Sequence, residues 1–166
     1  MGKRIIAVLA LAALAATWAG AKDWVKDLAS RDVQKRARAA SELTAKAAAE
    51  GLTEEEIEAL AAAVDDASDD VQRPAVEALA TNTKIATSQR YAPYFADRGD
   101  NFVAFLLWYS VYKTYGRIRS ATGGEAAGDM SEEMAYAKKE AKRAFANLLD
   151  PERKGWAQPY YEALTK

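Results

Sequence analysis

Residues 51–64 read GLTEEEIEALAAAV, and they carry the signals for the end of one helix and the start of another. Gly51 is the residue type that most often closes a helix. Thr53 can accept a hydrogen bond from the amide of Glu56, while the Glu56 carboxylate reaches back to the Thr53 amide, which makes a capping box. The apolar residues that follow recur at helical spacing: Ile57, Leu60, Ala61 and Val64. This stretch therefore predicts a helix that opens at Thr53.

Similar signals on both sides of that stretch predict further helices. Ser30 can cap the preceding helix, and the acidic run at residues 65–70 can end one helix and cap the next. Pro74 is tolerable near the first turn of that next helix. The residues expected to face inward are Val33, Ala37, Ala40, Leu43 and Ala47 in the preceding helix, and Val71, Ala75, Ala78 and Leu79 in the following one. No strand signal occurs in this region, so the expected fold class is all-α.

A short motif occurs twice in the same region. Asp32-Val33-Gln34 and Asp70-Val71-Gln72 lie 38 residues apart, and each precedes an alanine-rich helix. The pattern resembles that of the HEAT-repeat family, whose helical hairpins carry Asp, Val, Arg, Ala and Leu at the entry to the second helix. The matching residues are Asp32, Val33, Arg36, Ala37, Ala40 and Leu43 in the first copy, and Asp70, Val71, Arg73, Ala75, Ala78 and Leu79 in the second.

The resemblance covers residues 23–82. It implies helical hairpins stacked as a short HEAT-like solenoid, with a concave protein-binding face and no catalytic residues. Two repeats are fewer than a solenoid needs. Residues 83–166 are therefore expected to complete or cap the stack, within a single all-α domain that spans residues 22–166.

The region from residue 83 onward differs in composition, since 14 of the chain's 16 aromatic residues lie at Tyr91 or beyond. Residues 91–95 read YAPYF, and they predict a turn-prone aromatic cluster that ends at Gly99. Asp100 or Asn101 can cap a helix that runs to about Arg119. This helix is apolar on two faces, so we expect it to be buried all round or to lie between the core and a partner.

The remainder of the region predicts a connection and a last long helix. Residues 122–128 are expected to be a flexible connection, and the helix begins at Asp129 or Ser131 and ends before Pro151. An aromatic tail, residues 155–161, needs a surface to pack on. The residues of the long helix expected to face inward are Met134, Ala137, Ala141, Phe145 and Leu148. In total, six or seven helices are expected.

Residues 1–21 have the features of a cleaved signal peptide. Lys3 and Arg4 precede an apolar run at residues 5–16, and Ala19-Gly20-Ala21 is a small-x-small cleavage pattern. The apolar run is short for a membrane span, which needs about 20 residues. An uncleaved anchor is the alternative. The prediction is therefore an exported protein, periplasmic or extracellular in a bacterium, with no stable membrane insertion once the leader is removed.

Composition excludes several classes of function. The chain has 23 Lys and Arg against 24 Asp and Glu, and loss of the leader changes its net charge from −1 to −3. Non-specific nucleic-acid binding needs a strong positive field, so no nucleic-acid partner is expected. Cys and His are absent, which excludes disulfides, thiolate or imidazole metal sites, and triads with a His base or Cys nucleophile.

Most polar clusters in the sequence have a structural explanation. The carboxylates of the 65–70 run do not have the spacing of a calcium loop, and the Gly123-Gly124 loop lacks the residues of a phosphate cradle. Cations at the end of the aromatic helix complement its negative terminus, and cations of the last helix form a solvated face. These residues are Asp65, Asp66, Asp69 and Asp70; Lys113, Arg117 and Arg119; and Lys138, Lys139, Lys142 and Arg143. No catalytic residue, cofactor or metal is predicted.

The aromatic excess is the feature that favours a function, because aromatic side chains with a polar tip are enriched at protein interfaces. The prediction is a non-catalytic interaction module, an adaptor or accessory subunit of a larger envelope or extracellular assembly, that binds a protein partner or itself. An ordinary aromatic half-core would explain the same residues. The partner-binding candidates are Tyr91, Tyr94, Phe95, Trp108, Tyr112, Tyr115, Trp156, Tyr160 and Tyr161.

Two alternatives belong to other classes. In the first, the helix 102–119 lines a pocket of a ligand-binding or enzymatic domain, and Arg90, Arg98 or Arg117 holds an acidic ligand. Glycan hydrolysis needs only two carboxylates, but the sequence singles out no such pair. In the second alternative, identical copies pair through their aromatic faces as a self-assembling structural subunit.

Overall fold

The computed structural model describes residues 21–122 and 127–166, and within them the side chains of residues 24–122 and 130–166. The predicted leader, apart from Ala21, lies outside the described residues, and so does most of the 122–128 connection. All eight helices of the described residues are α-helices, and no strand occurs among them, which confirms the all-α class. Their bounds are α2 Ala21–Leu28, α3 Val33–Ala49, α4 Glu54–Ala63, α5 Asp69–Thr81, α6 Ile85–Asp97, α7 Asn101–Ala121, α8 Ala127–Ala146 and α9 Pro151–Thr165.

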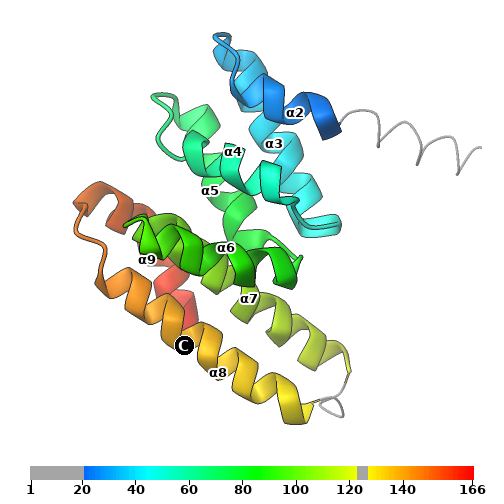
Figure 1. Cartoon of the computed structure of the whole chain (residues 1–166), viewed down its shortest axis with the longest axis vertical. Helices are drawn as coiled ribbons and strands as arrows, with labels where there is room; N and C mark the ends of the chain where they lie inside the picture. Colours follow the sequence, from blue (N-terminus) through cyan, green and yellow to red (C-terminus); the bar gives the residue numbers. More distant parts are fainter. Residues whose placement is uncertain (1–20, 123–126) are drawn as a thin grey trace, which may run out of the picture.

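Successive helices pair along the chain. α2 contacts α3, α4 contacts α5, and α6 contacts α7, each across a short turn (Figure 1). The second helices of these pairs form a layer, because α3 packs on α5 and α5 packs on α7. α8 and α9 both lie against α7. One hydrophobic core runs through all of these helices, from Leu28 to Leu164.

Residues 51–64 adopt the structure that their sequence predicted. The Thr53 hydroxyl accepts from the Glu56 amide at 3.3 Å, and the Glu56 carboxylate accepts from the Thr53 amide at 2.8 Å. Gly51 has φ +80°, the left-handed conformation that favours glycine at a helix end. The predicted inward residues of α4 and α5 are all buried: Ile57, Leu60, Ala61, Val64, Val71, Ala75, Ala78 and Leu79.

The start of α3 differs in detail from the prediction. Asp32, and not Ser30, is the N-cap, because its carboxylate accepts from the Gln34 amide at 2.9 Å. The Ser30 hydroxyl accepts from the Asp32 amide at 3.2 Å and so shapes the turn before the cap. Val33 was expected to face inward but is 42% exposed, because α3 has α2 and α5 as its main neighbours and neither covers its first turn.

The prediction of a turn at residues 91–95 was wrong. This segment lies inside helix α6, with Pro93 in the interior of the helix. Pro93 removes one backbone donor and favours a break. Pro93 lies on the exposed side of the helix, and the burial of Ala92 and Phe95 against the core stabilises the helix on the other side. The described residues contain eight helices, more than the six or seven expected, and neither α6 nor α9 was among the helices that the sequence patterns indicated.

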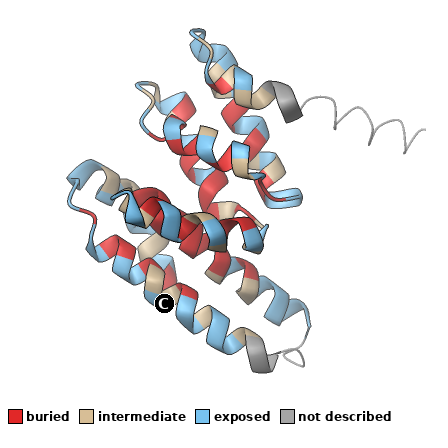
Figure 2. Ribbon diagram, viewed as in Figure 1, coloured by how far each residue is buried: buried red, intermediate tan, exposed pale blue. Residues whose placement is uncertain are grey.

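Helix α7 is the centre of the structure. It begins after the predicted cap Asp100, whose carboxylate accepts from the Val103 amide at 3.2 Å. Ten consecutive residues, 102–111, are buried, because α5, α6, α8 and α9 all pack against this helix (Figure 2). Among the described residues, no helix combines the length and the apolar run that a membrane crossing requires.

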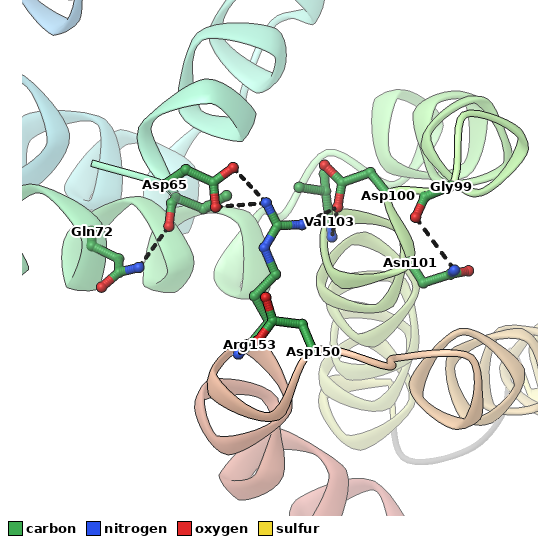
Figure 3. A network of polar contacts seen from close by, with 9 residues as sticks. Asp65, Gln72, Gly99, Asp100, Asn101, Val103, Asp150 and Arg153 are labelled. Carbon is green, nitrogen blue, oxygen red and sulfur yellow. Dashed lines mark hydrogen bonds and ion pairs between the residues drawn. The ribbon is translucent and has the colours of Figure 1, made fainter. Parts of the chain in front are cut away.

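Two arginines connect the turns within the three helix pairs. Arg36 of α3 donates to the Ser30 carbonyl at 3.0 Å in the first turn and to Asp66 in the second. Arg153, near the start of α9, donates to Asp65 in the second turn and to Asp100 in the third, the latter at 3.2 Å (Figure 3). The three turns are therefore joined in series, and the second of these connections also fixes α9.

A buried polar network connects the turns at the other end of the pairs. The buried Asn82 side chain accepts from the Leu52 amide at 2.8 Å and donates to the Ser88 hydroxyl at 2.9 Å. Ser88 in turn lies 2.9 Å from the Ser110 hydroxyl of α7. Every polar atom of this network has a partner, so it links the turns 50–53 and 82–84 to the central helix at no cost in unsatisfied groups.

Candidate functional site

The nine aromatic candidates do not form one surface. Phe95 and Trp108 are buried at 9% and 6% exposure, so their rings serve the core and offer little area to a partner. Tyr94 is 43% exposed. The other six are half-buried against the core: Tyr91, Tyr112, Tyr115, Trp156, Tyr160 and Tyr161.

Contacts between the rings explain this burial. Tyr161 of α9 stacks on Phe145 of α8 with centroids 4.0 Å apart and planes at 14°. Tyr160 meets Tyr109 of α7 edge-on at 5.3 Å. The aromatic tail thus packs on its own chain, as a helix that fills the space between α7 and α8.

A groove remains between α6 and α8, above α7. It has a volume of about 190 Å³. Trp108 of α7 forms its floor, and Tyr136 of α8 stands on its rim with its ring edge-on to the indole, at 5.4 Å between centroids and an angle of 85°. Tyr136 is 51% exposed although it touches a buried tryptophan. We call this hollow the aromatic groove; its other lining residues are Pro93, Ala96, Asp97, Asn101, Glu140, Arg143, Ala144 and Asn147.

Charged side chains border the aromatic groove. Arg143 lies 3.6 Å from Glu140 on the same helix, and Asp97 faces them from the end of α6. From the sequence, Arg143 was expected on a solvated face, and Tyr136 was not among the candidate residues. Tyr136 and Arg143 are seven residues apart, two turns of one helix face, and this spacing was the available signal.

The arginines proposed for an acidic ligand lie elsewhere. Arg90 pairs with Glu54, to which the Tyr91 hydroxyl also donates at 3.1 Å. Burial, and then that bond to Glu54, raises the pKa of Tyr91. Arg98 lies over the ring of Tyr94, 5.1 Å from its centroid. Arg117 borders a separate hollow near α9, so the three do not converge on one ligand.

Three of the four acidic residues of the 65–70 run have cationic partners. Asp66 binds Arg36 and Asp65 binds Arg153, while Asp69 lies 3.4 Å from Arg73. Burial lowers the pKa of Arg153, but the hydrogen bond to Asp65 and the charges of its carboxylate neighbours outweigh this effect and raise it. Over the part of the chain that the structure describes, no group of three or more acidic side chains is arranged to hold a metal ion.

The described residues form an all-helical fold, and the aromatic groove is a charge-bordered hollow on its central helix. Comparison of the chain with models of known protein families, with curated protein sequences and with solved structures found no match.

Proposed function

We propose that this chain is an exported, non-catalytic protein-interaction module that binds its partner at the aromatic groove. In this role it is an adaptor or accessory subunit of a larger envelope or extracellular assembly. The observation that carries the proposal is Tyr136, a half-exposed aromatic ring held edge-on by the buried Trp108 beside Arg143. Trp, Tyr and Arg are the residue types that dominate binding energy at protein interfaces.

The size of the groove favours a protein partner over a small molecule. Pockets for small ligands measure roughly 300–1,000 Å³. The aromatic groove, at about 190 Å³, suits one anchoring side chain of a partner. The rim residues Asp97, Glu140 and Arg143 supply both signs of charge, which would set the orientation of the bound segment.

We also propose that the helix pairs form a short HEAT-like stack. The succession of three pairs, with α3, α5 and α7 in contact in one layer, supports this proposal. The two motif copies lie at the starts of α3 and α5, which are the second helices of the first two pairs. In such a stack, α8 and α9 act as the cap that a short array requires.

Export is the part of the proposal that rests on the leader. Expression of the full chain in a bacterium, followed by fractionation and N-terminal sequencing, tests it directly. The expected product is a periplasmic or secreted protein that begins at Lys22. A cytoplasmic protein that retains Met1 would refute export, and a membrane-bound full-length protein would establish the anchor instead.

Site-specific photocrosslinking in the native host tests the groove. A photoreactive phenylalanine analogue at position 136 should give a discrete product with another protein, whereas the same group at Lys142, exposed on α8 and outside the groove, should not. Tyr136→Ala should remove co-purification of that protein without a change in the circular dichroism spectrum. Absence of a product from position 136, or equal products from both positions, would refute the proposed surface.

The molar mass of residues 22–166, measured by light scattering, distinguishes self-assembly from binding to a different protein. A monomer of the mature chain agrees with binding to a different protein. An oligomer that Tyr136→Ala dissociates would mean that the partner in the groove is a second copy of this chain.

A further inference from the structure

A second hollow lies on the other side of α7, between α5, α7 and α9. Arg117 is nine residues from Trp108, or two and a half helical turns, so the two side chains leave α7 in opposite directions. The hollow has a volume of about 100 Å³. We call it the α5–α7–α9 niche; the residues that matter below are Thr81, Tyr109, Lys113, Arg117 and Tyr160.

Two positive charges border the niche without a counter-ion. Lys113 and Arg117 are four residues apart on α7, where like charges repel. Within the described residues, neither side chain takes part in an ion pair. Both stand before the last turn of α7, whose basic residue is Arg119, so the negative end of this helix does not account for them.

Two tyrosine hydroxyls also lack a protein partner at the niche. Tyr109 and Tyr160 both line it, and neither hydroxyl makes a hydrogen bond within the described part of the chain. The Tyr109 side chain as a whole is only 7% exposed. In the described residues, every polar side-chain atom that is fully buried has a hydrogen-bond partner, so the unpartnered Tyr109 hydroxyl is not one of the fully buried atoms. Its hydroxyl oxygen is therefore accessible, and the niche is the hollow that it borders.

The electrostatic environment keeps these hydroxyls as donors. Burial is the main cause that raises the pKa of Tyr109, and burial, followed by the charge of Glu77, raises that of Tyr160. Both phenols therefore stay protonated at neutral pH and can donate. Two cations and two donors around one small volume are the requirements of an oxyanion.

We propose that the α5–α7–α9 niche binds one oxyanion, either phosphate or the carboxylate of a larger ligand. Lys113 and Arg117 supply the charge, and Tyr109 and Tyr160 donate hydrogen bonds. This site goes beyond the proposed partner surface and does not rest on it. Glu77 and the carbonyl end of α5 at Thr81 oppose an anion, so the affinity for a free ion is expected in the millimolar range.

Titration of the mature chain, residues 22–166, with inorganic phosphate at constant ionic strength tests the proposal. Amide chemical shifts of α7 and of residue 160 should change in a saturable way with phosphate and not with chloride. Lys113→Gln combined with Arg117→Gln should raise the dissociation constant at least tenfold. Arg119→Gln, two residues after Arg117 and outside the niche, is the matched control and should leave it unchanged.

Glu77→Gln gives a test of opposite sign. Removal of this nearby negative charge should lower the dissociation constant several-fold. All four substituted side chains are exposed, so the variants should fold, and circular dichroism checks this. Acetate in place of phosphate shows whether a carboxylate suffices. Saturation by either ion supports the site, whereas unsaturable shifts with both, or an unchanged constant in the double variant, would overturn it.

Discussion

Arg36 and Asp66, 30 residues apart in the chain, form two parallel hydrogen bonds: Nε to Oδ2 at 2.6 Å and Nη2 to Oδ1 at 3.0 Å. A planar guanidinium and a carboxylate match in this geometry as lysine could not. Arg36 also donates to the carbonyls of Ser30 and Arg31. This single side chain thus holds the first two helix pairs at a fixed spacing.

The first prediction concerns acid stability. The hydrogen bond from Arg36 is the main cause that lowers the pKa of Asp66, and burial opposes it. The pair therefore contributes stability above the unfolded pKa of about 3.9, and this contribution is lost as the pH falls through the lower folded value. Asp66→Asn should lower the urea midpoint at neutral pH, and the deficit should shrink on acidification.

The control for that series is Asp69→Asn. Asp69 and Arg73 are both about two-thirds exposed and lie 3.4 Å apart, and such surface pairs contribute little. Its urea midpoint should stay close to that of the wild type at every pH. A deficit of Asp66→Asn that is independent of pH would contradict the role given to the ion pair.

The second prediction compares two glycines. Gly51 and Gly99 have nearly equal φ values, +80° and +83°, so alanine at either site meets the same left-handed backbone penalty of roughly 1–2 kcal/mol. A Cβ at Gly51 would also lie 2.4 Å from the Lys84 Cβ, whereas one at Gly99 would meet nothing within 4 Å. Chemical denaturation should therefore show a clearly larger loss for Gly51→Ala. Equal losses would mean that the turns 50–53 and 82–84 do not approach closely.

The third prediction concerns the buried amide. Asn82→Ala should destabilise the protein by about 2 kcal/mol, because it leaves the buried Leu52 amide without a partner and removes one of the two partners of the Ser88 hydroxyl. Asn147 is exposed, so Asn147→Ala is the matched control and should lower the free energy of unfolding by less than about 0.5 kcal/mol. Thermal unfolding of both variants measures the difference, and similar melting temperatures would contradict the network.

The fourth prediction concerns the docking of α9. Arg153→Gln removes the connection to Asp65 and Asp100 and should cost about 1 kcal/mol, since Arg153 is still 26% exposed to solvent. Hydrogen exchange should accelerate in α9 while the core of α7 stays protected. Uniform acceleration throughout the chain would mean that α9 is part of the global unfolding unit.

Local sequence signals predicted the first half of the fold well. The capping box, Gly51 and the inward stripes of α4 and α5 depend on contacts within a few residues, and each of them formed as expected. The predicted turn at Pro93 was wrong, because the burial of Ala92 and Phe95 against α7 stabilises the helix by more than the local preference of proline for a break destabilises it. Burial energy depends on neighbours that periodicity does not identify.

The candidate sites could be predicted from local sequence signals only in part. Residue type suggested the aromatic candidates, but exposure separates Tyr94 and Tyr136 from the buried Phe95 and Trp108. Tyr136 became a candidate only because α8 places it on an indole from α7, 28 residues earlier in the chain.

The sequence by itself determined the all-helical class, the ends of several helices and the absence of thiol and imidazole chemistry, because these follow from residue type and short-range spacing. Only the tertiary structure decided which aromatic rings are core, which arginines join the turns, and where α7 leaves hollows on two sides. Those features depend on distances between residues far apart in the chain, and they exist only once the helices have packed.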